Sequence, residues 1–248
     1  MNTQENRVAQ LEKEVEFYKS VYFFLALITH ELRTNISPVI GFPLLLLHET
    51  SLTEKQKEYV NTLLISGAYP LLEQINKFAD FSKLIAERIE LEEGFVNLQT
   101  VIEKLLERYL PKAKEKGLDL QVLPTPEFHI PFKCDQLRLE QVLDELINNA
   151  IRFTQKGKVE ITSKLSHAES GQFIDFEVID TGKGISPEKL AMLSEFFNTS
   201  RPTMDPFLVS LGLMNVKLLC NLMKGKISIK SQIDGGSVFR FSLPYEKP

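Results

Sequence analysis

Thr29-His30-Glu31-Leu32-Arg33-Thr34 lies in the middle of a long run of apolar residues whose spacing alternates between three and four. The run extends from Val8 to Leu46, and this heptad repeat predicts one long helix that packs against partner helices. His30 comes one position after a residue of the apolar stripe, so we expect its imidazole to point outward from the edge of a helical bundle. A neutral imidazole nitrogen is a competent nucleophile, and the adjacent Glu31 can accept a proton from the ring. A solvated surface histidine without a chemical role is the alternative interpretation.

The residues after this helix predict a second helix that folds back along the first. We expect the first helix to end near Leu47 and a short turn to follow. Thr53 with Gln56 forms a capping-box pattern at the start of the second helix, and Ser51 with Glu54 is the alternative pair. Apolar residues continue beyond this point at helical spacing, so the two segments together predict a helical hairpin.

Prolines interrupt both predicted helices, at Pro38 and Pro43 in the first and at Pro70 in the second. Each proline removes a backbone hydrogen-bond donor and favours a kink. A hairpin of two helices buries little apolar surface by itself, whereas hairpins from two chains complete a four-helix bundle. The sequence therefore predicts a homodimer.

The composition is that of an ordinary globular protein, with 248 residues, of which 43% are hydrophobic and 25% are charged. The formal net charge of −4 gives no electrostatic reason to expect nucleic-acid binding. Cys134 and Cys220 lie far apart, which argues against a disulfide or a zinc site and favours a reducing, cytoplasmic compartment. The apolar runs are too short to span a bilayer and no signal-peptide pattern is present, so no membrane segment is expected.

After a short linker at residues 92–94, the pattern changes from long helices to alternating strands and helices. The change predicts an α/β sandwich as the second domain, so that the whole chain is of the α + α/β class. The expected strands are residues 96–98, 118–123, 158–165, 173–179, 226–231 and 237–243; the expected helices are residues 101–116, 136–153, 187–196 and 212–223; residues 124–131 and 197–211 are expected loops. Asp234-Gly235-Gly236 predicts a tight turn between the last two strands.

Two polar residues, Glu145 and Asn149, are four apart in the predicted helix at residues 136–153, so they share one helix face. A carboxylate and an amide oxygen on one face can hold a hydrated Mg²⁺ ion that bridges to phosphate groups. Arg152, three residues further on, can neutralise phosphate charge. A solvated polar stripe is the alternative interpretation.

Asp180-Thr181-Gly182-Lys183-Gly184 directly follows a predicted strand. A carboxylate at the end of a strand, followed by two glycines, suits the close approach of a flat ligand to the backbone. An ordinary turn is the alternative interpretation of this pentapeptide.

These stretches, in this order, resemble three motifs of the sensor histidine kinases. Thr29 to Asn35 is similar to the H-box, Asn149 to Thr154 to the N-box, and the stretch that begins at Asp180 to the first glycine box. The resemblance extends over nearly the whole chain, from about residue 20 to residue 244.

The resemblance implies a coiled-coil lead-in at residues 1–20, a dimerisation and histidine-phosphotransfer domain at residues 21–91, and an ATP-binding catalytic domain with a Bergerat fold at residues 95–248. It implies a kinase that autophosphorylates His30 from ATP with Mg²⁺. The phosphoryl group would then pass to an aspartate of a response-regulator receiver domain. Phosphatase activity toward the same regulator is a further implied activity, in which Thr34 positions a water molecule.

The resemblance also implies roles for single residues of the second domain. In the family, the residue at the place of Asn149 is the Mg²⁺ ligand, and the residue at the place of Asp180 accepts a hydrogen bond from the adenine amino group. The other implied nucleotide-binding residues are Arg152, Gly182, Gly184, Gly212, Leu213 and Ser237.

The chain departs from the family pattern at two places that bear on the chemistry. Glu145 stands where sensor kinases usually have asparagine; glutamate is typical of the related gyrase, MutL and chaperone ATPases, where it activates water. Glu145 is therefore a candidate base as well as a candidate Mg²⁺ ligand.

The second glycine box, Gly-x-Gly-Leu-Gly-Leu in the family, is replaced by residues 208–213, in which Gly212 is the one remaining glycine. A degenerate kinase that acts as a phosphotransferase or phosphatase, and a non-catalytic dimeric scaffold, are the alternatives to an active kinase.

Overall fold

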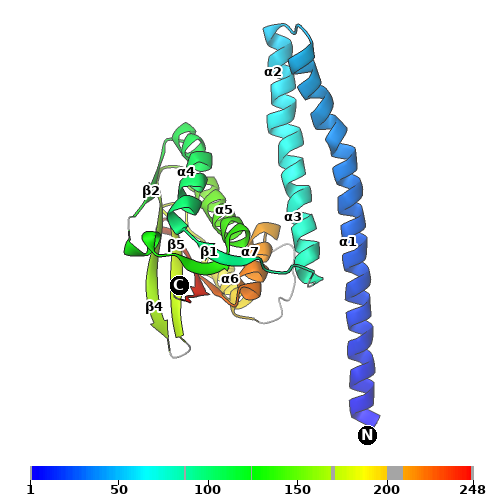
Figure 1. Cartoon of the computed structure of the whole chain (residues 1–248), viewed down its shortest axis with the longest axis vertical. Coiled ribbons are helices and arrows are strands. Elements are labelled where there is room, and N and C mark those ends of the chain that lie inside the picture. Colours follow the sequence, from blue (N-terminus) through cyan, green and yellow to red (C-terminus); the bar gives the residue numbers. More distant parts are fainter. Residues whose placement is uncertain (1, 87, 124, 169–170, 200–208, 247–248) are drawn as a thin grey trace. The chain divides into compact units, whose positions relative to one another are not determined.

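The computed structural model describes the backbone of residues 2–86, 88–123, 125–168, 171–199 and 209–246, and the side chains of these ranges from residue 24 onward except for residues 127 and 129. The chain divides into two compact units, Met1–Ile89 and Glu90–Pro248 (Figure 1). The first unit is helical and the second contains a mixed sheet with helices, so the predicted α + α/β class is confirmed.

The helical unit is an antiparallel hairpin (Figure 1). Its elements are α1 (Asn2–Glu49), α2 (Glu54–Leu63), the π-helical turn η1 (Leu64–Ala68) and α3 (Tyr69–Ile85). Of the two predicted capping pairs, the structure uses Thr53 with Gln56. The Gln56 N–H donates to Thr53 Oγ1 (3.3 Å) and the Thr53 N–H donates to Gln56 Oε1 (2.9 Å), which satisfies two backbone donors at the start of α2.

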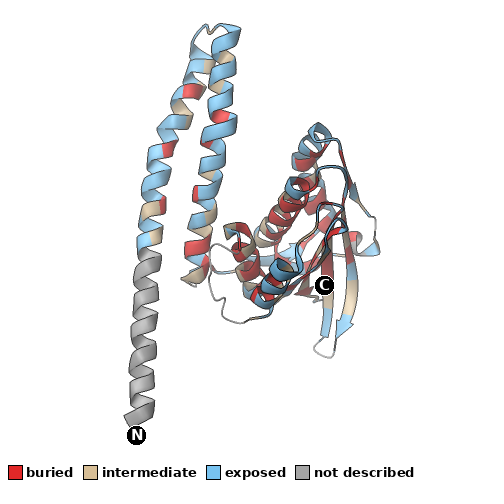
Figure 2. Cartoon of the chain, turned by 180° about the vertical axis from the view of Figure 1, so that it is seen from behind, coloured by how far each residue is buried: buried red, intermediate tan, exposed pale blue. Residues whose placement is uncertain are grey.

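From Thr29 onward, buried and exposed positions alternate along the heptad stripe (Figure 2). The buried set is Thr29, Ile36 and Pro43, and the exposed set is Leu32, Val39 and Leu46, whereas Leu25 before them is partly buried. Ile36 joins an apolar cluster with Leu64, Ala68 and Ile75 of the returning helix. One hairpin therefore covers one edge of the stripe and leaves the other uncovered. The coiled-coil prediction for residues 1–20 concerns side chains that lie outside the described residues.

The prolines affect the two long helices differently. α1 continues through Pro38 and Pro43. The second helix widens into η1 immediately before Pro70, where the Tyr69 N–H donates to the Leu64 carbonyl five residues earlier. Pro70 has no N–H to give to the carbonyl four residues before it, and the wider turn accommodates its ring. The prediction that Pro70 interrupts the second helix is confirmed, and the interruption is the π-helical turn η1.

The second unit contains a five-stranded sheet, a two-stranded sheet and four α-helices among its described residues. Its elements in chain order are β1 (Glu93–Val96), α4 (Leu98–Glu115), β2 (Leu118–Val122), η2 (Pro126–His129), β3 (Phe132–Asp135), α5 (Gln136–Phe153), β4 (Gly157–Ala168), β5 (Gly171–Asp180), α6 (Pro187–Asn198), α7 (Leu211–Leu222), β6 (Lys226–Gln232) and β7 (Gly236–Pro244). The larger sheet has the order β2-β4-β5-β7-β6, in which β2 and β4 are parallel and the other pairs antiparallel.

Most predicted elements of this unit are confirmed within a few residues, and α5 has the predicted bounds. The errors concern the small sheet of β1 and β3, whose strands pair antiparallel from Glu93 opposite Asp135 to Val96 opposite Phe132. The predicted linker at residues 92–94 is therefore partly strand, and β3 lies in the sequence assigned to no element. A strand of four residues is stabilised more by its pairing with a distant strand than by its own sequence pattern, so local patterns do not give its bounds.

The core lies between the larger sheet and the helices that contact it, where Figure 2 shows the buried residues. Phe176 of β5 is stacked on Phe241 of β7, with 4.6 Å between ring centroids, and is tilted against Phe132 of β3 at 6.1 Å. Asp180 lies four residues after Phe176 on the same strand, so both side chains are on the same face of the sheet. The sheet thus places one carboxylate at the edge of an apolar core.

Among the helices described, none is both long enough and apolar enough to cross a membrane.

Phe176→Ala tests the importance of the aromatic core. Phe176 is fully buried, and we expect its replacement to lower the free energy of unfolding by about 3–5 kcal/mol, because ring contacts are lost and a cavity remains. Urea denaturation followed by circular dichroism measures the change. Leu110→Ala is the control, because Leu110 is 46% exposed. An equal loss in both variants contradicts the prediction.

Candidate functional site

Helix α5 presents Glu145 and Asn149 on one buried face. Its first turn is held by Asp135, whose carboxylate accepts hydrogen bonds from the Arg138 N–H (3.1 Å) and from the Glu92 N–H (2.9 Å). Within the helix, Asn149 Nδ2 donates to Glu145 Oε1 at 3.2 Å, as the spacing of four predicts. The two side chains therefore meet on one face of α5 through the amide nitrogen of Asn149 and the carboxylate of Glu145.

The Glu145 carboxylate packs against the first turn of α7. A Cβ atom at Gly212 would lie 1.8 Å from Glu145 Oε1, so a residue without a side chain is required for this contact. Ser210, which stands in the place of a family glycine, is the N-cap of α7 and accepts a hydrogen bond from the Leu213 N–H (3.3 Å). The altered second glycine box thus begins a properly capped helix, whereas Leu208 lies outside the described residues.

Asp180 is buried at the end of β5, opposite Ser237 of β7. Its Oδ1 accepts a hydrogen bond from the Gly182 N–H at 2.8 Å. Burial raises the pKa of the Asp180 carboxyl above its ordinary value, against the hydrogen bonds from Gly182 and Ser237, which favour the ionised form. The Ser237 hydroxyl also lies 3.0 Å from the hydroxyl of Ser231, which donates to the Gly236 carbonyl at 2.7 Å. The predicted adenine acceptor is thus held rigidly by a polar network.

The two glycines after Asp180 allow close backbone packing. A Cβ atom at Gly182 would lie 2.7 Å from the Phe153 carbonyl oxygen at the end of α5. Gly184 has a φ of +67°, and a Cβ atom there would lie 1.8 Å from the Gln232 carbonyl oxygen. Both positions therefore require glycine, and the loop at residues 180–184 is closely packed between α5 and the end of β6.

Arg152 and Lys183 each place a cation near the ring of Phe153, which is not among the predicted site residues. The Phe153 ring is 46% exposed, with the Arg152 guanidinium 5.3 Å and the Lys183 ammonium 5.7 Å from its centroid. Two cations beside an exposed ring offer a surface for a flat anionic ligand. The sequence signal that could have identified Phe153 is its place at the end of the helix that carries Asn149 and Arg152.

A second residue that the sequence analysis did not select is Lys217 of α7. It is buried, and its ammonium group donates to the Phe197 carbonyl in the last turn of α6. Burial lowers the pKa of Lys217. The contact connects the last turn of α6 to the middle of α7.

The predicted residues of the second unit come together around the second half of α5. Contacts join Glu145 to Gly212 at the start of α7, and the end of α5 to Gly182 beside Asp180. Among the residues that the structure describes, no three His, Cys, Asp or Glu side chains are arranged to hold a metal ion.

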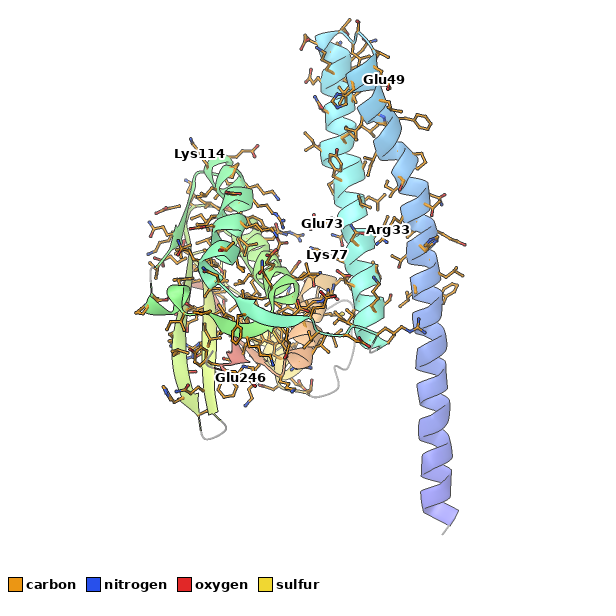
Figure 3. The ribbon with its side chains drawn as sticks, in the orientation of Figure 1. Arg33, Glu49, Glu73, Lys77, Lys114 and Glu246 are labelled. Carbon is orange, nitrogen blue, oxygen red and sulfur yellow. The ribbon has the colours of Figure 1, made fainter. Side chains whose placement is uncertain are left out.

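The predicted residues of the first unit lie on α1. His30, Glu31 and Thr34 are all exposed, and the Thr34 hydroxyl donates to the His30 carbonyl at 3.0 Å. Arg33 donates to Asn76 Oδ1 of α3 at 2.8 Å, which fixes this part of α1 against the returning helix (Figure 3). The prediction that the His30 imidazole is exposed on a long helix is confirmed.

Comparison with known proteins agrees with this arrangement. Residues 134–247 match the family described as histidine kinase-, DNA gyrase B-, and HSP90-like ATPase. Hybrid signal transduction histidine kinase B of Dictyostelium discoideum is 34% identical over 227 residues, which are 89% of this chain and 11% of that protein. Autoinducer 2 sensor kinase/phosphatase LuxQ of Vibrio vulnificus (strain YJ016) is 33% identical over 232 residues, which are 90% of this chain and 26% of that protein.

The solved structure of full-length ShkA in complex with AMPPNP superposes with a TM-score of 0.70 at 31% identity, over 90% of this chain and 46% of that chain. This chain belongs to the sensor histidine kinases. The structure of the Acinetobacter baumannii histidine kinase AdeS, at 23% identity and a TM-score of 0.58, shares the fold. The chain spans between about a tenth and a half of the length of the first two relatives and of ShkA.

Gly212→Ala tests the contact between α5 and α7. We expect a loss of about 1–3 kcal/mol in the free energy of unfolding, because the new methyl group overlaps the Glu145 carboxylate. Urea denaturation measures the loss. The double variant Glu145→Ala/Gly212→Ala removes the overlap, so adding Gly212→Ala to Glu145→Ala has little effect. Gly94→Ala is the control, because a Cβ atom there has no described neighbour within 4 Å. Additive losses in the double variant contradict the prediction.

Proposed function

We propose that this chain is the core of an ATP-dependent protein histidine kinase, which autophosphorylates His30 and passes the phosphoryl group to an aspartate of a response-regulator receiver domain. The observation that carries the proposal is that one chain combines an exposed histidine on α1 with a separate unit in which Asn149 and Asp180 belong to one buried polar site. Residues 21–91 would be the dimerisation and phosphotransfer domain, and residues 95–248 the catalytic domain.

The second unit would bind ATP around the end of α5. Asp180 accepts a hydrogen bond from the adenine amino group, and its bonds from Gly182 and Ser237 keep the carboxylate in place for this contact. The exposed Phe153 ring offers a face on which the adenine ring can stack. Arg152 neutralises phosphate charge. Gly182 and Gly184 keep the loop at residues 180–184 packed beside Asp180, since a Cβ atom at either position would overlap backbone atoms. Gly212 and Leu213 would be the nucleotide-binding residues of α7.

Asn149 and Glu145 would hold a Mg²⁺ ion that is shared with the phosphates. Asn149 Nδ2 donates to Glu145 Oε1, which leaves the Asn149 amide oxygen available as an acceptor. Mg²⁺ commonly takes one or two protein oxygens and completes its shell with water and phosphate, which fits this pair. When bound, the ion neutralises charge on the phosphate oxygens.

In the transfer step, a ring nitrogen of His30 attacks the γ-phosphorus of ATP in line with the bond to the bridging oxygen. The nitrogen–phosphorus bond forms, the phosphorus–oxygen bond breaks, and ADP leaves with the bond electrons. Glu31 takes the proton that the imidazole loses. Positioning and charge neutralisation would supply most of the rate enhancement. The phosphoryl group then passes from the phosphohistidine to a carboxylate of the receiver.

A homodimer is part of the proposal, and the uncovered half of the heptad stripe supports it. Leu32, Val39 and Leu46 are exposed, and Phe42 and Ile65 are exposed by 67% and 66%. Large apolar side chains gathered on one hairpin mark an interaction surface, and a second copy of the hairpin has the matching apolar stripe. The free, buried cysteines Cys134 and Cys220 support a reducing, cytoplasmic location.

A phosphotransferase or phosphatase that uses ATP poorly is the second candidate function. Glu145 favours it, because its carboxylate lies against Gly212, at the helix start where the family binds phosphates. A negative charge there opposes an incoming triphosphate. Thr34 would position the water that hydrolyses the aspartyl phosphate of the receiver. The relative LuxQ is named a kinase/phosphatase.

Incubation with γ-labelled ATP and Mg²⁺ distinguishes the two functions. We expect acid-labile label on the native chain and none on His30→Gln, since the amide of glutamine is not a nucleophile. Circular dichroism confirms that the variant is folded. Absence of label on the folded native chain contradicts kinase activity. In that case, loss of label from a phosphorylated receiver, slowed by Thr34→Ala, supports the second function.

The Asp180 contact predicts a dependence on pH that does not involve phosphate. We expect the carboxyl carbon of Asp180, followed by NMR, to titrate above the ordinary value of 3.8, because burial disfavours the charged form. Saturation with adenosine then lowers the pKa of Asp180, because the adenine amino group donates more favourably to the ionised carboxylate than to the protonated carboxyl. Adenosine affinity correspondingly falls as the pH drops through this range. A pKa that adenosine leaves unchanged contradicts the proposed contact.

A further inference from the structure

Helices α4 and α5 are connected by three contacts of cationic side chains with a constant separation of 36 residues. Lys104 Nζ lies 2.6 Å from Glu140 Oε2, Arg108 pairs with Asp144, and Lys116 Nζ donates to the Arg152 carbonyl at 3.2 Å. Because each residue of the first helix contacts the residue 36 positions later, the two helices run parallel and in the same direction. α4 therefore braces α5 along its length.

The contact of Lys116 differs from the other two in what it binds. Lys104 and Arg108 pair with carboxylates, whereas Lys116 donates to two backbone carbonyls, those of Ile151 (2.8 Å) and Arg152 (3.2 Å). The last carbonyls of a helix have no helical N–H partner, and a cation there also interacts favourably with the helix dipole. Lys116 is thus a C-terminal cap for α5 that comes from another element.

The position of Lys116 is itself well defined. Lys116 is the C-cap of α4, and Gly117 follows with a φ of +67°, which turns the chain into β2. β2 pairs in parallel with the start of β4, from Leu118 opposite Gly157. The helix before Lys116 and the strand after it therefore fix its backbone next to the end of α5, and the side chain reaches the two carbonyls from there.

The carbonyls that Lys116 holds belong to Ile151 and to Arg152, and Arg152 is one of the residues proposed to recognise the nucleotide. Phe153 follows directly, and its carbonyl oxygen lies against Gly182. Gly182 in turn donates to Asp180. A displacement of the end of α5 would move the guanidinium, the exposed ring and the support of the adenine acceptor together.

We propose that Lys116 is a positioning residue for nucleotide binding: by capping α5, it holds Arg152 and Phe153 in place against the loop at residues 180–184. The inference rests on the proposed function, because it takes an adenine nucleotide as the ligand of this site. Lys116 acts through the backbone of α5 and does not itself contact the nucleotide. A purely structural brace, as at Lys104, is the competing explanation.

The test compares Lys116→Met with Lys104→Met in the full chain, using ATP with Mg²⁺ and isothermal titration calorimetry. Both substitutions remove one cationic contact between α4 and α5, but Lys104 lies at the other end of the brace. We expect Lys116→Met to weaken ATP binding roughly tenfold, which corresponds to about 1.4 kcal/mol, and Lys104→Met to leave the affinity unchanged. Urea denaturation of each variant measures the loss of stability separately. Lys116→Arg, which can donate to the same carbonyls, restores the affinity.

The outcomes separate this inference from the function on which it rests. If the native chain does not bind ATP, the proposed function fails. If the native chain binds ATP and Lys116→Met binds it equally well, only the role of Lys116 is overturned. Equal weakening in Lys104→Met and Lys116→Met also overturns it, because general loosening then explains the effect. Should Lys116→Met fail to fold, Lys116→Gln takes its place: it keeps a donor but loses the charge, and we expect an intermediate affinity.

Discussion

The packing of α5 is the constraint on which the second unit depends. One side of this helix is fully buried, through residues such as Leu139 and Leu146, and its polar face carries Glu145 and Asn149. Its first turn is capped by Asp135, and its last carbonyls are held from outside the helix. A helix fixed at both ends and along one side keeps its remaining polar groups in place, and a site that binds through a few hydrogen bonds requires such preorganisation.

Glycines complete the site because the loop at residues 180–184 and the first turn of α7 approach their neighbours too closely for side chains. Gly212 faces the Glu145 carboxylate, Gly182 faces the end of α5, and Gly184 faces the end of β6. At Gly182 the backbone N–H also donates to Asp180 Oδ1. Packing therefore requires glycine at these positions, because protein atoms fill the space that a Cβ atom would occupy.

The helical unit follows a simpler rule. A stripe with a period of seven has two edges, and one antiparallel partner covers one of them. Thr29 and Ile36 lie on the covered edge, whereas His30 and Leu32 lie outside it. The histidine is thus accessible because it lies beside the stripe. The exposed leucine belongs to the edge of the stripe that one hairpin leaves uncovered. Both features follow from the arrangement of two helices rather than from any special contact.

The sequence by itself determined what depends on local spacing: the long first helix, a capping box before the second helix at one of two pairs, the bounds of α5 and the shared face of Glu145 and Asn149. These features involve residues a few positions apart, so periodicity and capping rules are sufficient. Only the tertiary structure decided the pairing of β1 with β3, the π-turn before Pro70 and the distant partners of the α5 ends. Such contacts depend on how separate elements pack, and no local spacing encodes which atoms meet across the core.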